Sequence, residues 1–329
     1  MTTTTPDRPA TREARQPKAR ASKRKQRAPR RSWRKAIRRD WQIYSLAIAP
    51  LAFFVIFRYL PMIGNVIAFR FYQPGGPIFG TQWVGFYYFD QVIHDPSFWQ
   101  VFENTVILGG LALLFGFPAP IILALLLNEV MHGGMKRFVQ SVSYLPHFLS
   151  TVVVAALMMQ GLQATGVVNE VIGWFGRSPI LFLQDPGWFR TIYVASDIWQ
   201  YAGWGTILYL AALSTIDPQL YEAAIVDGAG RWKQTWHVTL PNLRPTMMVV
   251  LILSVGQFMA VGFEKILLIY NPLTYPTADV ISTYLYRVGI VTGSFSYAAA
   301  VGLFESVIGL VLVLSTNAIS RRLVGASLW

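Results

Sequence analysis

The stretch around which this chain is organised runs from residue 217 to residue 245 and reads DPQLYEAAIVDGAGRWKQTWHVTLPNLRP. It is polar enough to lie in water, yet its apolar residues recur with a helical pattern. The sequence on either side is apolar over lengths that could cross a bilayer as a helix. The stretch is therefore a candidate coupling segment between two membrane spans.

Local signals divide this stretch into two short helices. Asp217 is a suitable N-cap, and Pro218 suits the first helical position, where its missing N–H costs nothing. Gly228 and Gly230 lower helix propensity and permit the positive φ of a sharp turn, so the first helix should end there. A second amphipathic segment is predicted to follow and to end at two prolines; its apolar side and its end consist of Trp232, Trp236, Leu240, Pro241 and Pro245.

Composition places the chain in a membrane. Of its 329 residues, 53% are hydrophobic and 13% are charged, which is outside the range of ordinary soluble domains. The absence of Cys excludes a disulfide framework and a thiolate metal site.

The net charge of +12 belongs to the N-terminal tail. Residues 1–39 hold fifteen Lys and Arg residues and two acidic residues, whereas the remainder holds thirteen basic and fourteen acidic residues. Residues 1–40 lack the apolar side chains needed to form a core and are predicted to be disordered. A nucleic-acid-binding arm is one interpretation, but a basic segment directly before a span favours a topogenic signal attracted to anionic lipid, so no nucleic-acid partner is expected.

Six apolar runs are each near the length that crosses the hydrocarbon core as a helix. They are predicted at about 41–67, 104–127, 138–162, 190–216, 246–270 and 297–319. With six alternating spans, most Lys and Arg outside them fall on one side, so both termini and residues 217–245 are predicted to be cytoplasmic. Residues 68–103 then form an extracytoplasmic loop. The predicted organisation is a tail (1–40), a first span with its loop (41–103) and a five-helix core (104–329).

The motif Glu222-Ala223-Ala224, followed by Gly228 and by Val238-x-Leu240-Pro241, resembles the EAA loop of the membrane subunits of binding-protein-dependent ABC importers. Val238 stands where that pattern usually has Ile. The resemblance implies an all-α membrane protein with six transmembrane helices, the MetI-like permease fold, and a cytoplasmic coupling helix that docks into a groove of an ATPase subunit. The implied ATPase-coupling residues are Tyr221, Glu222, Ala223, Ala224, Asp227, Gly228, Ala229, Leu240 and Pro241.

Other segments resemble a narrower group, the permeases for polysaccharide breakdown products of the aldouronate or alginate type. The segments are 57–61 (FRYLP), 116–125 (GFPAPIILAL), 144–148 (YLPHF) and 284–289 (YLYRVG), and the resemblance runs from about residue 41 to the end. It implies a multi-pass protein of the bacterial plasma membrane. The implied partners are a second permease subunit, expected to form a heterodimer, two ATPase subunits, an extracytoplasmic solute-binding protein and a saccharide substrate.

Several catalytic signatures are absent from the sequence. There is no Gly-x-x-x-x-Gly-Lys-[Ser/Thr] loop, so ATP and Mg²⁺ are expected on the partner ATPase and no cofactor on this chain. Glu129 and His132 have the spacing of a helical metal motif, but the other histidines lie in separate segments, so no metal site is expected. Without a hydrolase motif either, the chain is predicted to be a transport subunit and not an enzyme.

Polar residues inside the predicted spans suggest a substrate path, because such residues usually face the bundle interior or a water-filled cavity. One helical face of the fourth span and one of the fifth carry the candidates Asp197, Gln200, Tyr201, Trp204, Gln257 and Glu264. Their aromatic and hydrogen-bonding groups suit the C–H faces and hydroxyls of a sugar. Polar packing between helices is the alternative interpretation of these residues.

The function predicted is ATP-driven import of an oligosaccharide or another polysaccharide-derived sugar. The alternative is a secondary transporter driven by an ion gradient, which needs ion ligands in the membrane but no ATPase dock. The sequence leaves open the identity of the saccharide, the identity of the partner permease and the subunit that holds the substrate site.

Overall fold

A computed structural model describes residue 2 and residues 41–323, so the predicted disordered tail lies almost wholly outside the described residues. The chain divides into two compact units, one ending at Leu60 and one beginning at Pro61. In the first unit, helix α2 (Trp41–Phe54) leads into a π-helical turn (Val55–Tyr59).

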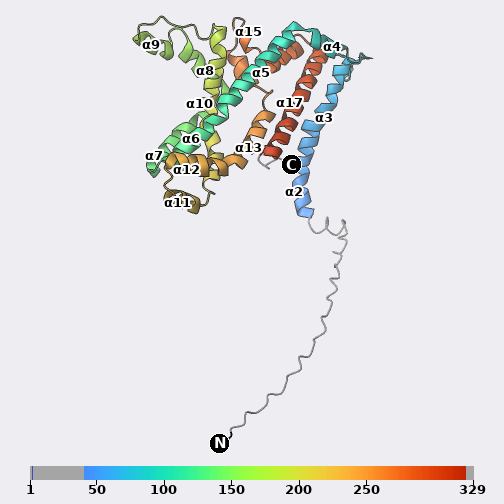
Figure 1. The fold of residues 1–329 in the computed structure, drawn as a ribbon. Coiled ribbons are helices and arrows are strands. Elements are labelled where there is room, and N and C mark those ends of the chain that lie inside the picture. The colour runs from blue at the N-terminus through green and yellow to red at the C-terminus, as the bar shows by residue number, and fades with distance from the viewer. Residues whose placement is uncertain (1, 3–40, 324–329) are drawn as a thin grey trace. The chain divides into compact units, whose positions relative to one another are not determined.

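The second unit is almost entirely helical, with one small hairpin (Figure 1). It begins in α3 (Leu60–Met62), and a 3₁₀ helix (Ile63–Phe69) leads into the antiparallel strands β1 (Arg70–Phe71) and β2 (Gln82–Trp83). The next helices are α4 (Tyr87–His94), α5 (Pro96–Gly116), α6 (Pro118–Glu129), α7 (Gly133–Tyr144), a 3₁₀ turn (Leu145–Phe148), α8 (Thr151–Leu162), α9 (Val167–Trp174) and α10 (Pro186–Leu213). The last are α11 (Pro218–Val226), α12 (Arg231–Gln234), a π turn (Thr235–Thr239), α13 (Leu240–Gly256), α14 (Phe263–Ile269), α15 (Tyr275–Ala278), α16 (Ile281–Leu285), a π turn (Tyr286–Val291) and α17 (Phe295–Leu323).

Five helical stretches of the described chain are long and apolar enough to cross a membrane. They are Trp41–Phe69, Pro96–Glu129, Thr151–Trp174, Arg231–Gly256 and Phe295–Arg322. The fourth predicted span corresponds to α10, a single helix of 28 residues that is not among the five. Asp197, Gln200 and several Trp and Tyr residues lower its mean hydropathy. The all-helical fold is confirmed, whereas the sixth membrane crossing stays a prediction.

The third predicted span, residues 138–162, is not one helix. Its first part belongs to the amphipathic helix α7, and the 3₁₀ turn that contains Pro146 separates α7 from α8. Ser150 then caps α8 by accepting a hydrogen bond from the N–H of Val153. The span-length stretch therefore begins at Thr151 and continues through α9 to Trp174.

The fifth predicted span, residues 246–270, is displaced in the same way. Helical structure runs without interruption from Arg231 to Gly256 and stops there, and residues 257–262 are non-helical before α14 begins. Pro241 and Pro245 were expected to end the preceding helix, but the helix continues through both. Pro241 lies in the first turn of α13, directly after the π turn Thr235–Thr239, where a missing N–H and the wider winding accommodate its ring, whereas Pro245 lies inside α13.

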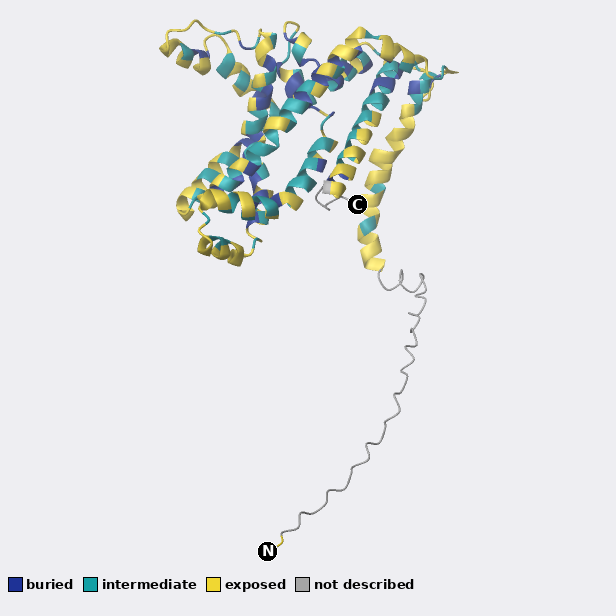
Figure 2. Cartoon of the chain, viewed as in Figure 1, coloured by how far each residue is buried: buried dark blue, intermediate teal, exposed yellow. Residues whose placement is uncertain are grey.

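Helix α10 is the centre of the packing. One core cluster joins α10 to α8 and α14 around Tyr193 and Ile266, and another joins α10 to α6 and α13 around Tyr209 and Leu243. Eight residues of α10 are buried and none of α11 is, and Figure 2 shows dark-blue segments in the part of the unit that contains α10 but not in α11. Where α10 meets α7 the backbones are very close, because a Cβ on Gly203 would overlap the Ser143 carbonyl.

A buried polar network ties α5, α10 and α16 together. The side-chain N–H of Asn104 donates to the backbone carbonyl of Asp279 at 3.0 Å, and Arg190 donates to the Asn104 oxygen at 2.9 Å. Thr283 and Arg287 both donate to the Asp279 carboxylate. Asn104, Asp279 and Thr283 thus gain partners that offset the loss of water, whereas Arg190 Nε and Arg287 Nη1 have no hydrogen-bond partner in the described chain.

Asp95 holds the start of α5 to two later elements. Its carboxylate accepts hydrogen bonds from the hydroxyls of Tyr284 and Tyr297, each at 2.7 Å. Partial burial opposes ionisation of Asp95, but these hydroxyls and the Ser97 N–H offset it and hold the pKa of the carboxyl below its usual value. The stabilisation from this group is therefore complete above the unfolded pKa of about 3.9 and is lost as the pH falls through the folded value.

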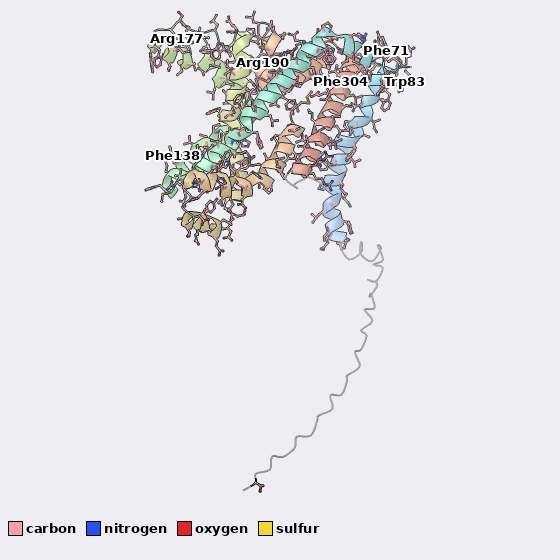
Figure 3. The ribbon with its side chains drawn as sticks, viewed as in Figure 1. Phe71, Trp83, Phe138, Arg177, Arg190 and Phe304 are labelled. Atoms are coloured by element: carbon pink, nitrogen blue, oxygen red, sulfur yellow. The ribbon has the colours of Figure 1, made fainter. Side chains whose placement is uncertain are left out.

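The second unit has two distinct ends. Phe71 and Trp83 of the hairpin lie at the same end as Arg177, and Phe138 of α7 lies at the other (Figure 3). Helix α11 lies at the end occupied by α7 (Figure 1). Lys136 and Arg137, which belong to α7, are therefore at the same end of the unit as α11.

Candidate cleft and coupling segment

Helix α11 begins and ends where local chemistry predicts. The Asp217 side chain caps it by accepting a hydrogen bond from the N–H of Gln219 at 2.9 Å. At the other end, Gly228 has φ +73° and its N–H donates to the Ile225 carbonyl, while the N–H of Ala229 donates to the Ala224 carbonyl at 2.8 Å. This pair of bonds is a Schellman motif, which requires a left-handed residue at the position of Gly228.

Side-chain hydrogen bonds close α11 and the following helix into a hairpin, residues 217–241. The hydroxyls of Tyr221 and Thr239 are 3.0 Å apart, and Gln234 donates to the Ala229 carbonyl at 2.7 Å. The hairpin presents apolar side chains to its surroundings, since Ile225 is 62% and Val226 is 88% exposed. These two side chains make α11 a candidate contact surface.

The predicted coupling residues occupy this hairpin. Glu222, Ala223 and Asp227 are exposed on α11 and its cap, and Tyr221, Ala224 and Ala229 are half-buried against the hairpin. Leu240 and Pro241 lie at the start of α13, half-buried and beyond the turn. Glu129 is the last residue of α6, and His132 directly precedes α7. The Glu129 carboxylate pairs with the Arg231 guanidinium at 3.4 Å.

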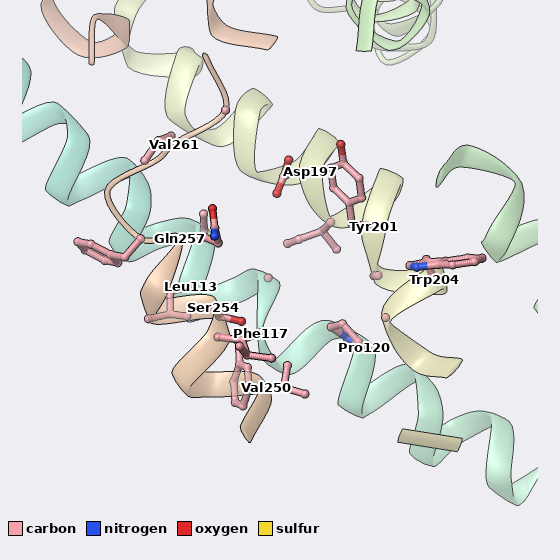
Figure 4. Close-up of a pocket in the computed structure, with 18 of the residues that line it drawn as sticks. Leu113, Phe117, Pro120, Asp197, Tyr201, Trp204, Val250, Ser254, Gln257 and Val261 are labelled. Atoms are coloured by element: carbon pink, nitrogen blue, oxygen red, sulfur yellow. The ribbon is translucent and has the colours of Figure 1, made fainter. Parts of the chain in front are cut away.

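A cleft of about 1300 Å³ opens between α5, α6, α10, α13 and α14 (Figure 4). Five of the six predicted path residues line it: Asp197, Tyr201, Trp204, Gln257 and Glu264. They come from two directions, α10 on one side and, on the other, the α13–α14 break with Gln257 and the first turn of α14 with Glu264. Gln257 lies in the non-helical segment 257–262, which interrupts the fifth predicted span. This break places Gln257 and Glu264 at the cleft wall.

Gln200 differs from its neighbours, because it is buried to 1% exposure and does not line the cleft. Its side-chain N–H contacts the Leu149 carbonyl at 3.4 Å, and its side-chain oxygen has no hydrogen-bond partner in the described chain. Its surroundings are those of a residue that packs α10 against the segment before α8.

Lys265 lines the cleft but is not among the residues predicted from the polar helical faces of the spans. Its ammonium donates to the Asp197 carboxylate at 3.0 Å and lies over the rings of Tyr193 and Tyr201, 5.7 and 5.4 Å from their centroids. The Lys265 side chain is 4% exposed and that of Asp197 is 33% exposed. Burial of an ammonium requires such a partner. A lysine within the apolar run 263–269 was the signal that could have identified it.

His147 is a second residue near the cleft wall that was not predicted from the polar helical faces of the spans. Its ring stacks on Trp204 with centroids 4.4 Å apart and planes 6° apart, and Phe148 contacts the same indole edge to face. One face of Trp204 is therefore covered by the chain itself. These contacts fix the indole at the cleft wall.

Comparison with known proteins identifies the family. The family described as "Binding-protein-dependent transport system inner membrane component" matches residues 116–325. Protein LplB of Bacillus subtilis (strain 168) is 47% identical over 292 residues, which cover 88% of this chain and 92% of LplB. The polygalacturonan/rhamnogalacturonan transport system permease protein YteP of the same organism is 44% identical over 281 residues, covering 85% of this chain and 88% of YteP.

Solved structures agree with the sequence relatives. A chain from the crystal structure of a bacterial ABC transporter involved in the import of the acidic polysaccharide alginate is 46% identical, with a TM-score of 0.82 over 88% of this chain and 98% of that one. A chain of the alginate ABC transporter in complex with its alginate pentasaccharide-bound periplasmic protein is 45% identical, with a TM-score of 0.83 over 89% and 99%. The chain belongs to the family of inner membrane components of binding-protein-dependent transport systems.

Proposed function

We propose that this permease subunit imports an oligosaccharide, or another polysaccharide-derived sugar, through the cleft that α10 lines. The observation that carries the proposal is the cleft itself, with a volume of about 1300 Å³ and a wall that combines aromatic rings with hydrogen-bonding groups. Such a wall suits a substrate that has both apolar C–H faces and many hydroxyls. The named relatives that transport polygalacturonan, rhamnogalacturonan or alginate support the same substrate class.

Like its relatives, the chain is a transport subunit of an ABC importer and not an enzyme. ATP hydrolysis belongs to a separate subunit, and we expect ATP and Mg²⁺ to bind there. The alternating-access cycle then needs a mechanical link between the ATPase and the cleft. The hairpin of residues 217–241 is the proposed link, because it is ordered by its own caps and presents Ile225 and Val226 outward.

The proposed assembly contains this chain, a second and different permease subunit, two ATPase subunits and an extracytoplasmic solute-binding protein. The alginate transporter complexed with a periplasmic protein supports the last of these partners. In the proposed topology α10 also crosses the membrane, which brings the five span-length stretches to six, and both termini are cytoplasmic. The grouping of Lys136, Arg137 and α11 at one end of the second unit supports this orientation.

The charges of the cleft define what this half of the path offers a substrate. Among the described residues that line it, the charged ones are Asp197, Glu264 and Lys265. Lys265 is committed to Asp197, so Glu264 carries the remaining formal charge. We infer that this subunit contacts the hydroxyls and ring faces of the sugar, and that a cation for any uronate carboxylate comes from the partner permease.

Replacing Trp204 tests the path directly. Trp204→Ala removes an indole that lines the cleft and should lower saccharide uptake by reconstituted transporter, while the amount of assembled complex is maintained. Trp199→Ala is the matched control, since Trp199 is on the same helix, 51% exposed and outside the cleft lining. Equal uptake by the two variants, or loss of assembly in Trp204→Ala with normal uptake per complex, would show that Trp204 serves packing alone.

A further inference from the structure

A second pocket lies at the end of the unit opposite α11, and it shares no lining residue with the cleft. Its volume is about 360 Å³, near the lower limit of roughly 300 Å³ for small-molecule sites. Three separate segments form it: the residues after β1, helix α4, and the junction of the last π turn with α17. Figure 1 shows α4 and α11 at opposite ends of this unit.

The pocket walls are pinned by hydrogen bonds between residues far apart in sequence. The N–H of Tyr72 donates to the Ser296 hydroxyl at 3.1 Å, and that hydroxyl donates to the Arg70 carbonyl at 2.8 Å. The rings of Tyr72 and Phe295 meet edge to face at 5.6 Å. Tyr297 is held from outside the pocket by its bond to Asp95. The site is therefore built before any ligand arrives, which reduces the entropy lost on binding.

The lining has the composition of a carbohydrate site. The lining includes the aromatic rings of Tyr72, Tyr88 and Tyr297 and the side-chain amides of Gln73 and Gln91. In the part of the chain that the structure describes, the hydroxyls of Tyr72 and Tyr88 and the amide of Gln73 make no side-chain hydrogen bond, so they are free to bind a ligand. No Asp, Glu, Lys or Arg is among the described lining residues, and a charged ligand would leave its charge unpaired here.

We propose that this pocket is a second saccharide-binding site, which takes one or two uncharged sugar rings. The inference rests on the proposed transport of saccharides. In the proposed topology the pocket faces the extracytoplasmic side, where a sugar chain arrives from the binding protein. It holds neutral rings of the arriving chain, at a site separate from the cleft that conducts it.

The absence of Cys from the sequence permits a direct test. Gln91→Cys places the chain's one thiol at the pocket. In the control Asp90→Cys, the thiol is on the preceding residue of α4, whose native side chain is 76% exposed and outside the lining. The complete transporter is reconstituted, and labelling of this chain by a membrane-impermeant maleimide is timed. The probes are xylotriose, maltotriose, galactotriose and trigalacturonate, and uptake of the same four sugars by wild-type transporter is measured in parallel.

When a neutral trisaccharide is present at about ten times its Kd, roughly nine tenths of the pockets are occupied. The thiol of Gln91→Cys should therefore be labelled roughly tenfold more slowly. Labelling of Asp90→Cys should not change, and trigalacturonate should protect less than a neutral trisaccharide. Uptake by wild type without selective protection of Gln91→Cys by any probe would overturn the pocket assignment alone. Failure of wild type to import any of the sugars, together with no protection, would overturn the proposed function and this inference with it.

Discussion

At the scale of single residues, the Asp197–Lys265 pair carries the sharpest energetic consequence. The two side chains join α10 to α14 at the cleft wall, but their environments differ, because Lys265 is 4% exposed and Asp197 is 33% exposed. Removing the carboxylate strands a buried ammonium, whereas removing the ammonium leaves a carboxylate that water can reach. The two single substitutions should therefore be unequal.

We expect Asp197→Asn to lower the free energy of unfolding by about 2 kcal/mol, less than the ~3–5 kcal/mol of a fully buried pair because Asp197 is partly solvated. Lys265→Met should lower it less, and the double variant should match Lys265→Met more closely than Asp197→Asn. Thermal unfolding of the purified complex measures all three. If Lys265→Met proves the more damaging single change, the burial argument is wrong.

The residue scale also shows what the sequence could not reveal. The stripe of polar residues on α10 predicted Asp197, Tyr201 and Trp204 at a path because they share one helical face. The same logic misplaced Gln200, since the face of a helix does not state whether a neighbouring backbone, here the Leu149 carbonyl, covers it. Lys265 and His147 meet their partners only through tertiary packing, 68 and 57 residues away, and no local pattern encodes those contacts.

At the scale of elements, the hairpin of residues 217–241 depends on one backbone conformation. Gly228 has φ +73°, and a Cβ there would meet nothing within 4 Å, so strain and not space makes glycine necessary. A β-branched residue in this region costs at least about 1–2 kcal/mol. The loss should appear in the hairpin and leave the membrane helices intact.

Gly228→Val is predicted to reduce copurification of the ATPase and to abolish uptake, with normal membrane insertion. Gly230→Ala is the matched control, because Gly230 has φ −67° and its Cβ position is also unobstructed. Pull-down of the ATPase with each variant, followed by uptake, checks this. Wild-type copurification and uptake in Gly228→Val would remove the coupling role from this turn.

A second element-scale prediction concerns the approach of α7 to α10. Gly203→Ala would bring a methyl group onto the Ser143 carbonyl and should destabilise the complex by about 1–3 kcal/mol. Gly110→Ala, in α5, meets nothing within 4 Å and should be neutral or stabilising by up to about 1 kcal/mol. The thermal unfolding temperature should therefore fall for Gly203→Ala and stay unchanged or rise for Gly110→Ala; equal shifts would contradict the close backbone contact.

Element boundaries followed from the sequence only where their signals are local. Asp217, Pro218 and Gly228 marked the ends of α11 correctly, because caps and a left-handed turn act within a few residues. Pro241 was misleading: a π turn accommodates it, and the helix continues to Gly256. The break after Gly256 had no proline or charge to announce it, although it places Gln257 and Glu264 at the cleft.

At the scale of the whole molecule, the proposed mechanism requires that the hairpin of residues 217–241 and the cleft be linked mechanically. The hairpin of residues 217–241 continues directly into the helix Arg231–Gly256, and that helix ends at the cleft wall. A displacement of the hairpin can thus be transmitted along one helix to Ser254 and Gln257. The proposed docking of this hairpin on an ATPase would have no counterpart in an ion-driven transporter.

The most direct test measures saccharide uptake into proteoliposomes that contain this chain, its partner permease and the ATPase subunits. The binding protein is supplied on the extracytoplasmic side, and either ATP on the cytoplasmic side or an imposed proton or sodium gradient is the energy source. The account predicts uptake with ATP and binding protein, no uptake with a gradient alone, and loss of ATP-driven uptake in Gly228→Val. Uptake driven by an ion gradient without ATP would contradict it.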